Sequence, residues 1–139
     1  MITIIKGRKI SKGVAEGRAL VTKNPISFLG DIDPKTGIVV GPNHELYGCS
    51  IVGKILVFPT GKGSTVGSYV LYQLKKNGLA PAAIVNKFSE AIVAVGAIIS
   101  DIPLVDCLEE DPTISIETGD NVRVNGTEGY IEVESWRKQ

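Results

Sequence analysis

Residues 55–78, with the sequence ILVFPTGKGSTVGSYVLYQLKKNG, constrain the fold more strongly than any other stretch of the chain. They begin with a nearly continuous apolar run, which is typical of a strand buried on both faces. A glycine-rich turn follows, and Gly78 can end a helix in the left-handed conformation. Between the turn and Gly78 the apolar residues recur at the spacing of one buried helix face: Val66, Tyr69, Val70 and Leu74. The stretch therefore predicts a buried strand, a tight turn and a helix.

Short apolar runs separated by turn residues predict further strands along the chain. The expected strands are residues 2–5, 18–22, 37–41, 53–59 and 82–85. A structured polar loop is expected at residues 27–37 and a second helix at residues 89–100. The alternating pattern of residues 113–135 is typical of three antiparallel strands. We therefore predict a single α/β domain, rich in strand, over residues 1–139.

Charge and hydropathy exclude several classes of protein. Fifteen basic and fifteen acidic residues cancel, and neither sign forms a long run. A basic surface that follows nucleic-acid phosphates is therefore not expected, so nucleic acid is not an expected partner. No stretch reaches the roughly 18 uninterrupted apolar residues of a membrane span, and the first residues lack the organisation of a signal peptide. These features predict a cytoplasmic protein that does not enter a membrane.

Few residues are available to hold a metal ion. The sequence has two cysteines, Cys49 and Cys107, and one histidine, His44. Iron–sulfur clusters are held mainly by several cysteine thiolates, so two cysteines cannot complete such a site. A histidine-rich zinc site is excluded too. Each cysteine is predicted to be a buried structural thiol, and any metal chemistry would have to come from another chain.

Two roles are open to Ser64 at the start of the predicted helix. Its oxygen could accept a hydrogen bond from an amide two or three residues later and so cap the helix, which is worth about 1 kcal/mol. The flanking glycines, Gly61 and Gly63, also let a ligand approach the backbone closely. The helix N-terminus favours phosphate or carboxylate, and the same field would stabilise a serine alkoxide. Lys62 adds a cation that suits either task, so capping and chemistry both stay open.

Other familiar site patterns are absent or incomplete. A P-loop needs glycine where Leu56 stands, and Lys62 is followed by glycine rather than by serine or threonine. The glycine spacing of the turn is one residue longer than that of the dinucleotide fingerprint. His44 has no local partner that defines a role for it. Asp31 and Asp33 precede a proline, where turn formation accounts for them, and catalysis by this pair of carboxylates is the alternative.

Several ordered motifs resemble the small subunit of the aconitase X family. They are DIDPKTGIV (residues 31–39), His44, GKILVFPTGKGSTVGS (residues 53–68) and APAAIV (residues 80–85). The resemblance implies a swivelling β/β/α domain, which is a strand-rich sandwich or half-barrel flanked by short helices, as in the aconitase swivel domain. It also implies a large catalytic subunit as partner, in a heterodimer or higher heteromer. That partner would carry an iron–sulfur cluster of the 4Fe–4S kind, with none bound by this chain alone.

The resemblance implies an activity as well. Archaeal members of the family are hydro-lyases that convert (R)-5-phosphomevalonate, a small phosphorylated hydroxy acid, to trans-anhydromevalonate 5-phosphate in isoprenoid biosynthesis. In aconitase-like dehydratases the swivel domain supplies a serine base, which matches Ser64 here, while the open iron of the cluster acts on the departing hydroxyl. The implied substrate-binding residues are Gly61, Lys62, Gly63 and Thr65. Asp33 and His44 are candidates of second rank near the subunit junction.

The chain departs from the relatives in two places. Ordinary aconitases follow the serine turn with an arginine that grips a substrate carboxylate, whereas this chain continues with Thr65, so Lys62 or the partner would supply that clamp. Many bacterial relatives have proline after the histidine, where Glu45 stands here. Those relatives can act on hydroxyproline-type substrates, which makes a dehydratase for another hydroxy acid one alternative.

Two further interpretations compete with this one. The chain could be a non-catalytic anion-binding or assembly module that uses the same helix N-terminus. Residues 82–105 are also similar to the mobile phosphohistidine domain of phosphoenolpyruvate-using synthases, which shares the swivelling fold. The histidine that carries phosphate in that domain follows a serine, but Glu90 follows Ser89 here. This second resemblance therefore supports the fold and argues against a phosphocarrier.

Overall fold

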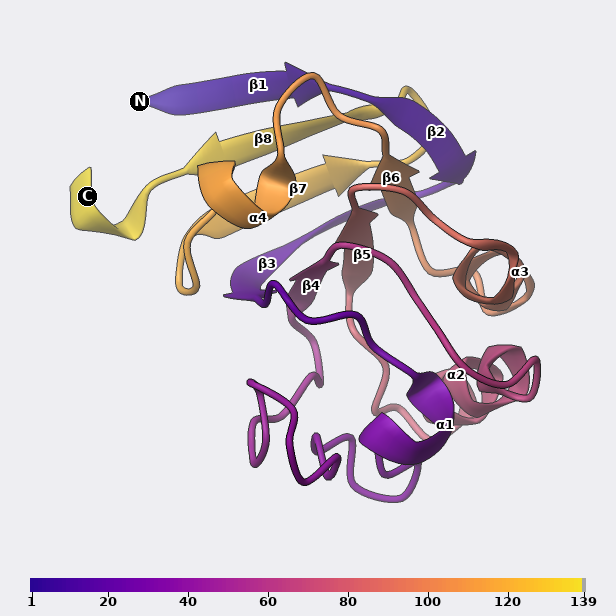
Figure 1. The fold of residues 1–139 in the computed structure, drawn as a ribbon. Coiled ribbons are helices and arrows are strands. Elements are labelled where there is room, and N and C mark those ends of the chain that lie inside the picture. The colour runs from indigo at the N-terminus through magenta and orange to yellow at the C-terminus, as the bar shows by residue number, and fades with distance from the viewer. Residues whose placement is uncertain (139) are drawn as a thin grey trace.

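Strand β4 (Ile55–Phe58) lies at the centre of the fold (Figure 1), which the computed structural model describes for residues 1–138. All four residues of β4 are fully buried. Ile55 and Val57 belong to one hydrophobic core, whereas Leu56 and Phe58 belong to another. The prediction of a strand buried on both faces is therefore confirmed.

The strands form one mixed, eight-stranded sheet within residues 1–138, in the order β1-β8-β7-β3-β4-β5-β6-β2. Besides β4, they are β1 (Ile2–Lys6), β2 (Arg8–Ser11), β3 (Val14–Val21), β5 (Ala83–Asn86), β6 (Leu104–Asp106), β7 (Asn121–Asn125) and β8 (Tyr130–Glu134). Strands β3 to β6 pair in parallel, and the other pairs are antiparallel. Only Gly7 separates β1 from β2, yet these strands stand at opposite ends of the order. The sheet therefore curls until its two ends meet, as Figure 1 shows.

Strand β3 carries the chain from one half of the curled sheet to the other. Residues 14–18 pair with β7 in the antiparallel half, and residues 19–21 pair with β4 in the parallel half. The two halves enclose a core of small and β-branched side chains: Ile5, Ala19, Ile55, Val57, Ala83, Val85, Val105, Ile116, Val122, Val124, Ile131 and Val133. Such side chains suit the pleated surface of a strand, so this core stabilises both halves together.

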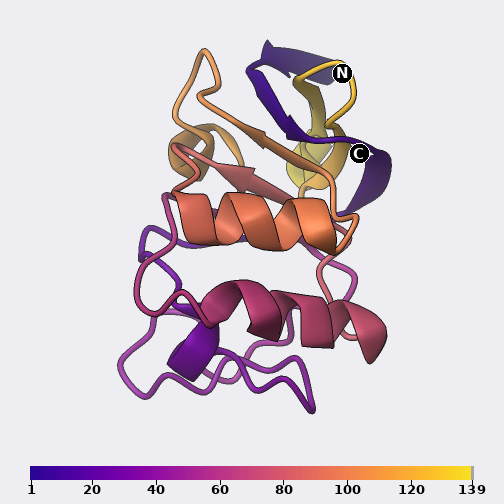
Figure 2. The same ribbon diagram turned by 90° about the vertical axis from the view of Figure 1, so that its right-hand side faces the viewer.

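Helices α2 (Gly67–Lys76) and α3 (Ala91–Ile99) lie side by side over the parallel half of the sheet (Figure 2). Gly96 lets the two helices approach, because a Cβ at this position would lie only 3.2 Å from the Cα atom of Ser68. The second core includes Leu56, Phe58, Leu71, Leu74, Ile84, Val93 and Ala97. Two strand layers and one helix layer thus give the expected β/β/α class, a strand-rich half-barrel flanked by short helices.

The buried face of α2 differs from the predicted face at two residues. The helix begins at Gly67 and buries Gly67, Val70, Leu71 and Leu74. Val66 and Tyr69, which the sequence pattern places on the buried face, are 48% and 57% exposed. The prediction for these two residues is wrong. Val66 still lies before the helix, and within the helix the buried face includes Leu71 and leaves Tyr69 outside. Gly78, with φ of +72°, ends the helix as predicted.

Two predicted strands are absent from the part of the chain that the structure describes. Residues 37–41 form only isolated bridges, because they lie in a long connection that folds back on itself and not beside a strand of the sheet. The first of the three predicted C-terminal strands is instead helix α4 (Pro112–Ser115). Asp111 caps this helix by accepting a hydrogen bond from the amide of Thr113 at 3.0 Å, and Pro112 suits its first turn.

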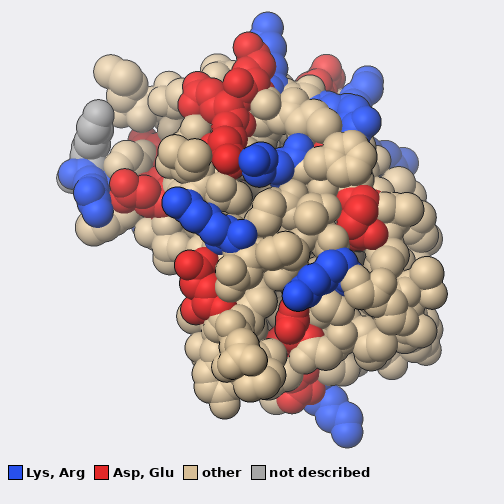
Figure 3. Space-filling view, in the orientation of Figure 1, with Lys and Arg blue, Asp and Glu red and all other residues tan. Residues whose placement is uncertain are grey.

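The remaining elements are short. Helix α1 (Phe28–Asp31) is a single kinked turn within the predicted polar loop, and η1 (Trp136–Lys138) is a 3₁₀ turn after β8. Among residues 1–138, no helix has the length and apolar character needed to cross a membrane. Acidic and basic side chains are interspersed over the face shown in Figure 3.

Asp106 is a fully buried acid that ties β6 to β2. The Arg8 guanidinium donates to both carboxylate oxygens of Asp106, at 2.9 and 2.8 Å, and the amide of Ser89 donates to Oδ2 at 2.7 Å. Burial alone would raise the pKa of Asp106, but the hydrogen bonds from Arg8 and Ser89 outweigh burial and hold this pKa below its ordinary value. Asp106 is therefore ionised at neutral pH and stabilises the fold through Arg8.

Replacement of Arg8 by methionine is expected to destabilise the protein at pH 7 by more than the loss of an exposed ion pair does, because the ionised carboxylate would stay buried without its cation. The loss stays below that of a fully enclosed pair because the Arg8 side chain is 51% exposed. A lowered folded-state pKa means that the contribution of Asp106 is present above the ordinary aspartate pKa and is lost as pH falls through the folded value. The Arg8→Met penalty should therefore shrink in acid. Urea unfolding over a range of pH measures both effects.

Arg137→Met is the matched control for this experiment. Arg137 pairs with Glu117 at 3.2 Å, but the two side chains are 65% and 51% exposed. Its loss should change the free energy of unfolding by less than about 1 kcal/mol. Equal losses in the two variants, or an Arg8→Met penalty that does not shrink in acid, would contradict the role given to Asp106.

Candidate functional site

The turn formed by residues 61–65 leaves the carboxyl end of β4 and runs beside residues 24–28. The amide of Ile26 donates to the carbonyl oxygen of Thr60 at 3.2 Å, and the amide of Lys62 donates to the carbonyl oxygen of Ile26 at 3.1 Å. These two bonds extend parallel pairing one step beyond the strand. In open α/β sheets, ligands bind outside the carboxyl ends of the strands, so this edge is a favourable place for a site.

Two glycines allow the turn to pack closely against its surroundings. A side chain at Gly61 would overlap the carboxylate of Glu90, which caps α3 by accepting from two amides of its first turn at 2.9 and 2.8 Å. Gly63 has φ of +92° and touches the Ser27 hydroxyl, so a side chain there would be both strained and blocked. The turn is thus held between the start of α3 and the segment that precedes α1.

Ser64 lies at the exposed outer end of this turn. Its Oγ accepts the predicted hydrogen bond from the amide of Val66 at 3.1 Å, and its carbonyl oxygen accepts from the amide of Gly67 at 2.9 Å. The N-cap of α2 is Val66, however, so Ser64 stabilises the turn before the helix and the prediction that it caps the helix is wrong. Within residues 1–138 the hydroxyl proton of Ser64 has no acceptor, and the amides of Gly63, Ser64 and Thr65 donate to no protein group. The turn therefore offers one hydroxyl and several N–H groups at the start of α2, where negative charge is favoured.

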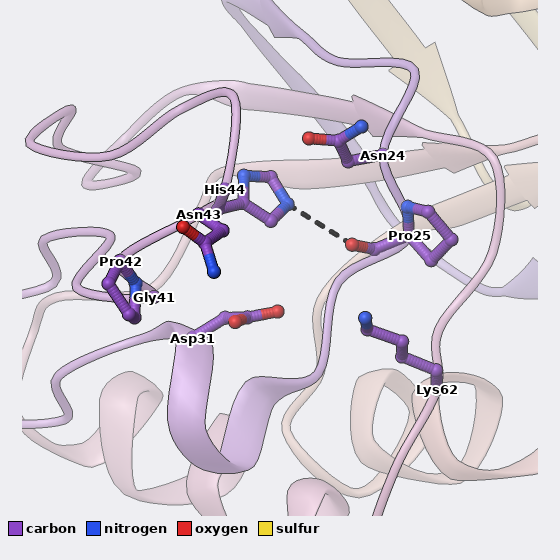
Figure 4. Close-up of a pocket in the computed structure, with 8 residues that line it drawn as sticks. All are labelled: Asn24, Pro25, Asp31, Gly41, Pro42, Asn43, His44 and Lys62. Carbon is purple, nitrogen blue, oxygen red and sulfur yellow. Dashed lines mark hydrogen bonds between the residues drawn. The ribbon is translucent and has the colours of Figure 1, made fainter.

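A cavity of about 400 Å³ opens beside the turn (Figure 4). Its wall is formed by Asn24, Pro25, Asp31, Gly41, Pro42, Asn43, His44 and Lys62. These residues come from three segments of the chain: residues 24–31, residues 41–44 and Lys62. Among the residues singled out from the sequence, Lys62 and His44 line the cavity, whereas Ser64, Thr65 and the turn glycines lie outside its wall.

Asp33, a candidate from the sequence, is not part of the cavity wall either. Its Oδ1 accepts a hydrogen bond from the amide of Lys35 at 2.9 Å, so it stabilises a turn. Asp31 lines the cavity instead. The amide of Ser27 donates to Oδ2 of Asp31 at 2.8 Å, and the amide of Val40 donates to the carbonyl oxygen of Asp31 at 2.7 Å. Asp31 thereby joins two of the three segments that surround the cavity.

Both ring nitrogens of His44 are bonded to the main chain. Nδ1 accepts a hydrogen bond from the amide of Leu46 at 3.0 Å, and Nε2 lies 3.1 Å from the carbonyl oxygen of Pro25 (Figure 4). A neutral ring whose Nδ1 accepts carries its proton on Nε2, which then donates to Pro25. His44 therefore holds residues 42–46 against residues 24–25, and neither ring nitrogen is left for a ligand.

Glu45 strengthens the same contact between segments. Its Oε1 accepts from the hydroxyl of Thr22 at 2.5 Å and from the amide of Lys23 at 3.1 Å, while its own amide donates to Oδ1 of Asn24 at 2.9 Å. The hydrogen bond from the Thr22 hydroxyl, followed by the one from the Lys23 amide, lowers the pKa of Glu45 below its ordinary value. Ionised Glu45 thus keeps one rim of the cavity attached to β3 and its extension.

Three side chains in the wall carry donors without a protein partner: Lys62, Asn24 and Asn43. Within residues 1–138, Lys62 forms no ion pair and the amide group of Asn43 makes no hydrogen bond. Asn24 uses its oxygen for the Glu45 amide, and its NH₂ group stays available. Sequence reasoning missed Asn24 and Asn43, because each stands beside a proline, where the local signal predicts a loop and nothing more.

The described residues do not fit a metal centre. Within residues 1–138, no group of three or more histidine, cysteine, aspartate or glutamate side chains could hold a metal ion. Both cysteines are free thiols. Cys49 packs half-buried against the core, whereas Cys107 is exposed because it turns out of β6 with φ of +48°, so the predicted burial of Cys107 is wrong. An iron–sulfur cluster, which needs several thiolates, does not fit this donor set.

Several known proteins resemble this chain along nearly its whole length. The profile of the aconitase X swivel domain matches residues 4–133. The chain is 67% identical over 129 residues to the phosphomevalonate dehydratase small subunit of Methanosarcina acetivorans. This match covers 93% of this chain and 90% of that protein. It is 60% identical over 134 residues to the protein of the same name from Methanococcoides burtonii, covering 96% and 98%. The crystal structure of Thermococcus kodakaraensis aconitase X in its holo-form matches with a TM-score of 0.90 and 54% identity, covering 94% of this chain and 98% of that one.

Thr22→Val is expected to raise the pKa of Glu45 toward that of an ordinary glutamate, because it removes the hydroxyl that stabilises the ionised carboxylate. NMR titration of the side-chain carboxyl carbon of Glu45 measures this change. The lowered pKa of Glu45 stabilises the native protein above the ordinary glutamate pKa, and this contribution is lost as pH falls through the folded value. As the pH falls from the ordinary glutamate pKa through the folded value, Thr22→Val should therefore lose less stability than the wild type.

Thr22→Ser is the control, because it keeps the hydroxyl and should leave the pKa of Glu45 low. The amide of Leu46, which His44 holds, should exchange its hydrogen faster in Thr22→Val than in Thr22→Ser. An unchanged Glu45 pKa in Thr22→Val would show that the hydroxyl does not hold this rim of the cavity.

Proposed function

The chain belongs to the aconitase X swivel-domain family, and we propose that it acts as the small subunit of a phosphomevalonate dehydratase in which Ser64 is the proton acceptor. The enzyme is a hydro-lyase in which this subunit works with a large subunit. We take the substrate to be (R)-5-phosphomevalonate and the product to be trans-anhydromevalonate 5-phosphate. The relatives that carry the small-subunit name cover nearly all of this chain, which supports transfer of the activity to it.

The reaction needs a base at one position of the substrate. Dehydration removes a proton from C2, the carbon beside the carboxylate, and the hydroxyl group from C3. The electron pair of the C2–H bond becomes the C2–C3 double bond, and the hydroxyl leaves as water after it gains a proton. We assign the C2 proton to Ser64. A serine hydroxyl is a weak base by itself, so the surrounding groups must stabilise its ionised form.

The environment of Ser64 Oγ is the observation that carries this assignment. The amide of Val66 already donates to Oγ at 3.1 Å, and the start of α2 adds a field that favours negative charge. The side chain is exposed, and its hydroxyl proton has no acceptor within residues 1–138. Gly61 and Gly63 keep the neighbouring backbone free of side chains. These features support an alkoxide that meets a substrate from the solvent side.

The rest of the active centre belongs to the large subunit in this proposal. We propose that the enzyme works with an iron–sulfur cluster of the 4Fe–4S kind, which the donor set of residues 1–138 does not fit. We therefore assign the cluster to the large subunit. The exposed turn that carries Ser64 would then face that subunit, with the substrate between the two chains.

Ser64→Ala in the assembled two-subunit enzyme is expected to lower kcat by roughly 10³-fold or more, because the group that removes the C2 proton is lost. The change removes one hydrogen bond at an exposed turn, so the free energy of unfolding should fall by about 1 kcal/mol at most. Product formation from (R)-5-phosphomevalonate, thermal unfolding of the small subunit and co-purification of the large subunit measure activity, stability and assembly.

Ser68→Ala is a matched control one helical turn away. The Ser68 hydroxyl donates to the carbonyl oxygen of Ile92 at 2.7 Å, so it joins α2 to α3 and has no part in the proposed chemistry. This variant should lose some stability and keep its turnover. If the Ser64→Ala complex retained wild-type turnover, the proton acceptor would be another group. If Ser64 affected only the affinity of an anion for the isolated chain, a binding module would be the better description.

A further inference from the structure

We infer that the cavity beside the Ser64 turn binds the phosphate group of the substrate through Lys62, Asn43 and Asn24. This inference rests on the function proposed above. It assigns the two ends of the substrate to two places on the small subunit, with the carboxylate at the turn and the phosphate in the cavity. No motif in the sequence marks the two asparagines as ligands.

The residues around the cavity offer several donors and one positive charge. Lys62 supplies an ammonium group that forms no ion pair within residues 1–138, and Figure 4 shows its side chain extending into the cavity. Asn43 supplies an amide without a protein partner in the same range. Donors of this kind bind phosphate oxygens, and a cation strengthens each bond.

Asn24 is oriented by the protein so that it presents a donor. Its Oδ1 accepts the amide of Glu45 at 2.9 Å, which leaves the NH₂ group as the free end of the side chain. Glu45 is itself held by the Thr22 hydroxyl. This chain of contacts fixes which way the amide of Asn24 faces before any ligand arrives, and a donor that is already placed loses less entropy on binding.

His44 and Asp31 complete the wall without competing for the same role. His44 has both ring nitrogens bonded to the main chain, so it is a positioning residue that holds Asn43 close to Pro25. Asp31 offers no donor, and its Oδ2 is occupied by the Ser27 amide. An anion in this cavity is therefore held by Lys62 and the two asparagines, while Asp31, whose carboxylate also faces the cavity in Figure 4, donates nothing to it.

The order of atoms in the substrate decides which anion belongs in the cavity. The carboxylate is attached to C2, so it must lie directly beside Ser64 when the C2 proton is removed. There it meets the unpartnered amides of Gly63, Ser64 and Thr65. The phosphate is separated from C2 by C3, C4, C5 and the ester oxygen.

The position of Lys62 matches this separation. Lys62 is two residues from Ser64, a backbone span of at most about 7 Å, and its side chain leads away from the turn into the cavity. A group that is four atoms removed from C2 can therefore reach the cavity while C2 stays at Ser64. The cavity, at about 400 Å³, is large enough for a phosphate and ordered water.

The test measures two constants on the assembled enzyme with its large subunit. The first is kcat/KM for (R)-5-phosphomevalonate. The second is the inhibition constant of (R)-mevalonate, which has the same carboxylate and hydroxyl but no phosphate. Asn43→Ala should lower kcat/KM by about 10-fold and Lys62→Met by about 100-fold, as expected for hydrogen bonds to a charged group. Neither change should alter the inhibition constant of mevalonate by more than about twofold.

Three further variants complete the design. Asn43→Asp keeps the shape of the side chain but places a carboxylate in the wall, so kcat/KM should fall further than in Asn43→Ala. Asn43 is exposed, so this change should not impair folding. Lys62→Arg keeps the charge and should restore part of the loss of Lys62→Met. Lys35→Met removes an exposed lysine outside the cavity and should change neither constant.

The outcomes separate this inference from the proposed function. If the mevalonate inhibition constant rises in step with the loss of kcat/KM, the cavity binds the carboxylate and the phosphate assignment is wrong. If Asn43→Ala and Asn43→Asp keep wild-type kcat/KM, the cavity does not bind the substrate at all. A wild-type complex that fails to dehydrate (R)-5-phosphomevalonate would instead overturn the proposed function, and the phosphate site with it.

Discussion

The burial of strand β4 on both faces is the constraint on which the rest of the structure depends. Side chains of one parity fill the half-barrel, and those of the other parity fill the space beneath α2 and α3. A shift of one residue would exchange the two sets, so the register of the central strand is strongly specified. The chain leaves β4 at Phe58 and enters the Ser64 turn a few residues later. The packing of two cores thus also determines where the turn emerges.

The cavity depends on bonds between loops far more than on the sheet. Main-chain groups of residues 24–28 bind the turn, and His44 and Glu45 attach a third loop to the same segment. These bonds hold the wall in shape, while the ammonium group of Lys62 and the NH₂ groups of Asn24 and Asn43 have no partner within residues 1–138. A site whose ligands are held by such supporting contacts is arranged before the ligand binds.

Local signals in the sequence were sufficient to predict β4 and the turn that follows it, but they were insufficient to predict the cavity. The apolar run of β4, the glycine turn and the hydrogen bond to Ser64 Oγ each follow from neighbours within a few residues, and the structure contains all three. Asn24 and Asn43 line the same cavity only after three loops have folded together, and no periodic pattern in the sequence indicates this. Residues 37–41 have the composition of a strand, but pairing needs a partner that the topology does not supply.

The pairing of the first strand with the last has a consequence for the growing chain on the ribosome. Ile2 lies opposite Glu134 in the sheet, so β1 has no neighbour on that side until β8 has been made. The parallel half and both helices contain only residues that are synthesised earlier, and they can pack before β1 is secured. The half-barrel therefore cannot close before β8 has been made, and until then a nascent polypeptide exposes an unpaired strand edge to other chains in the cell.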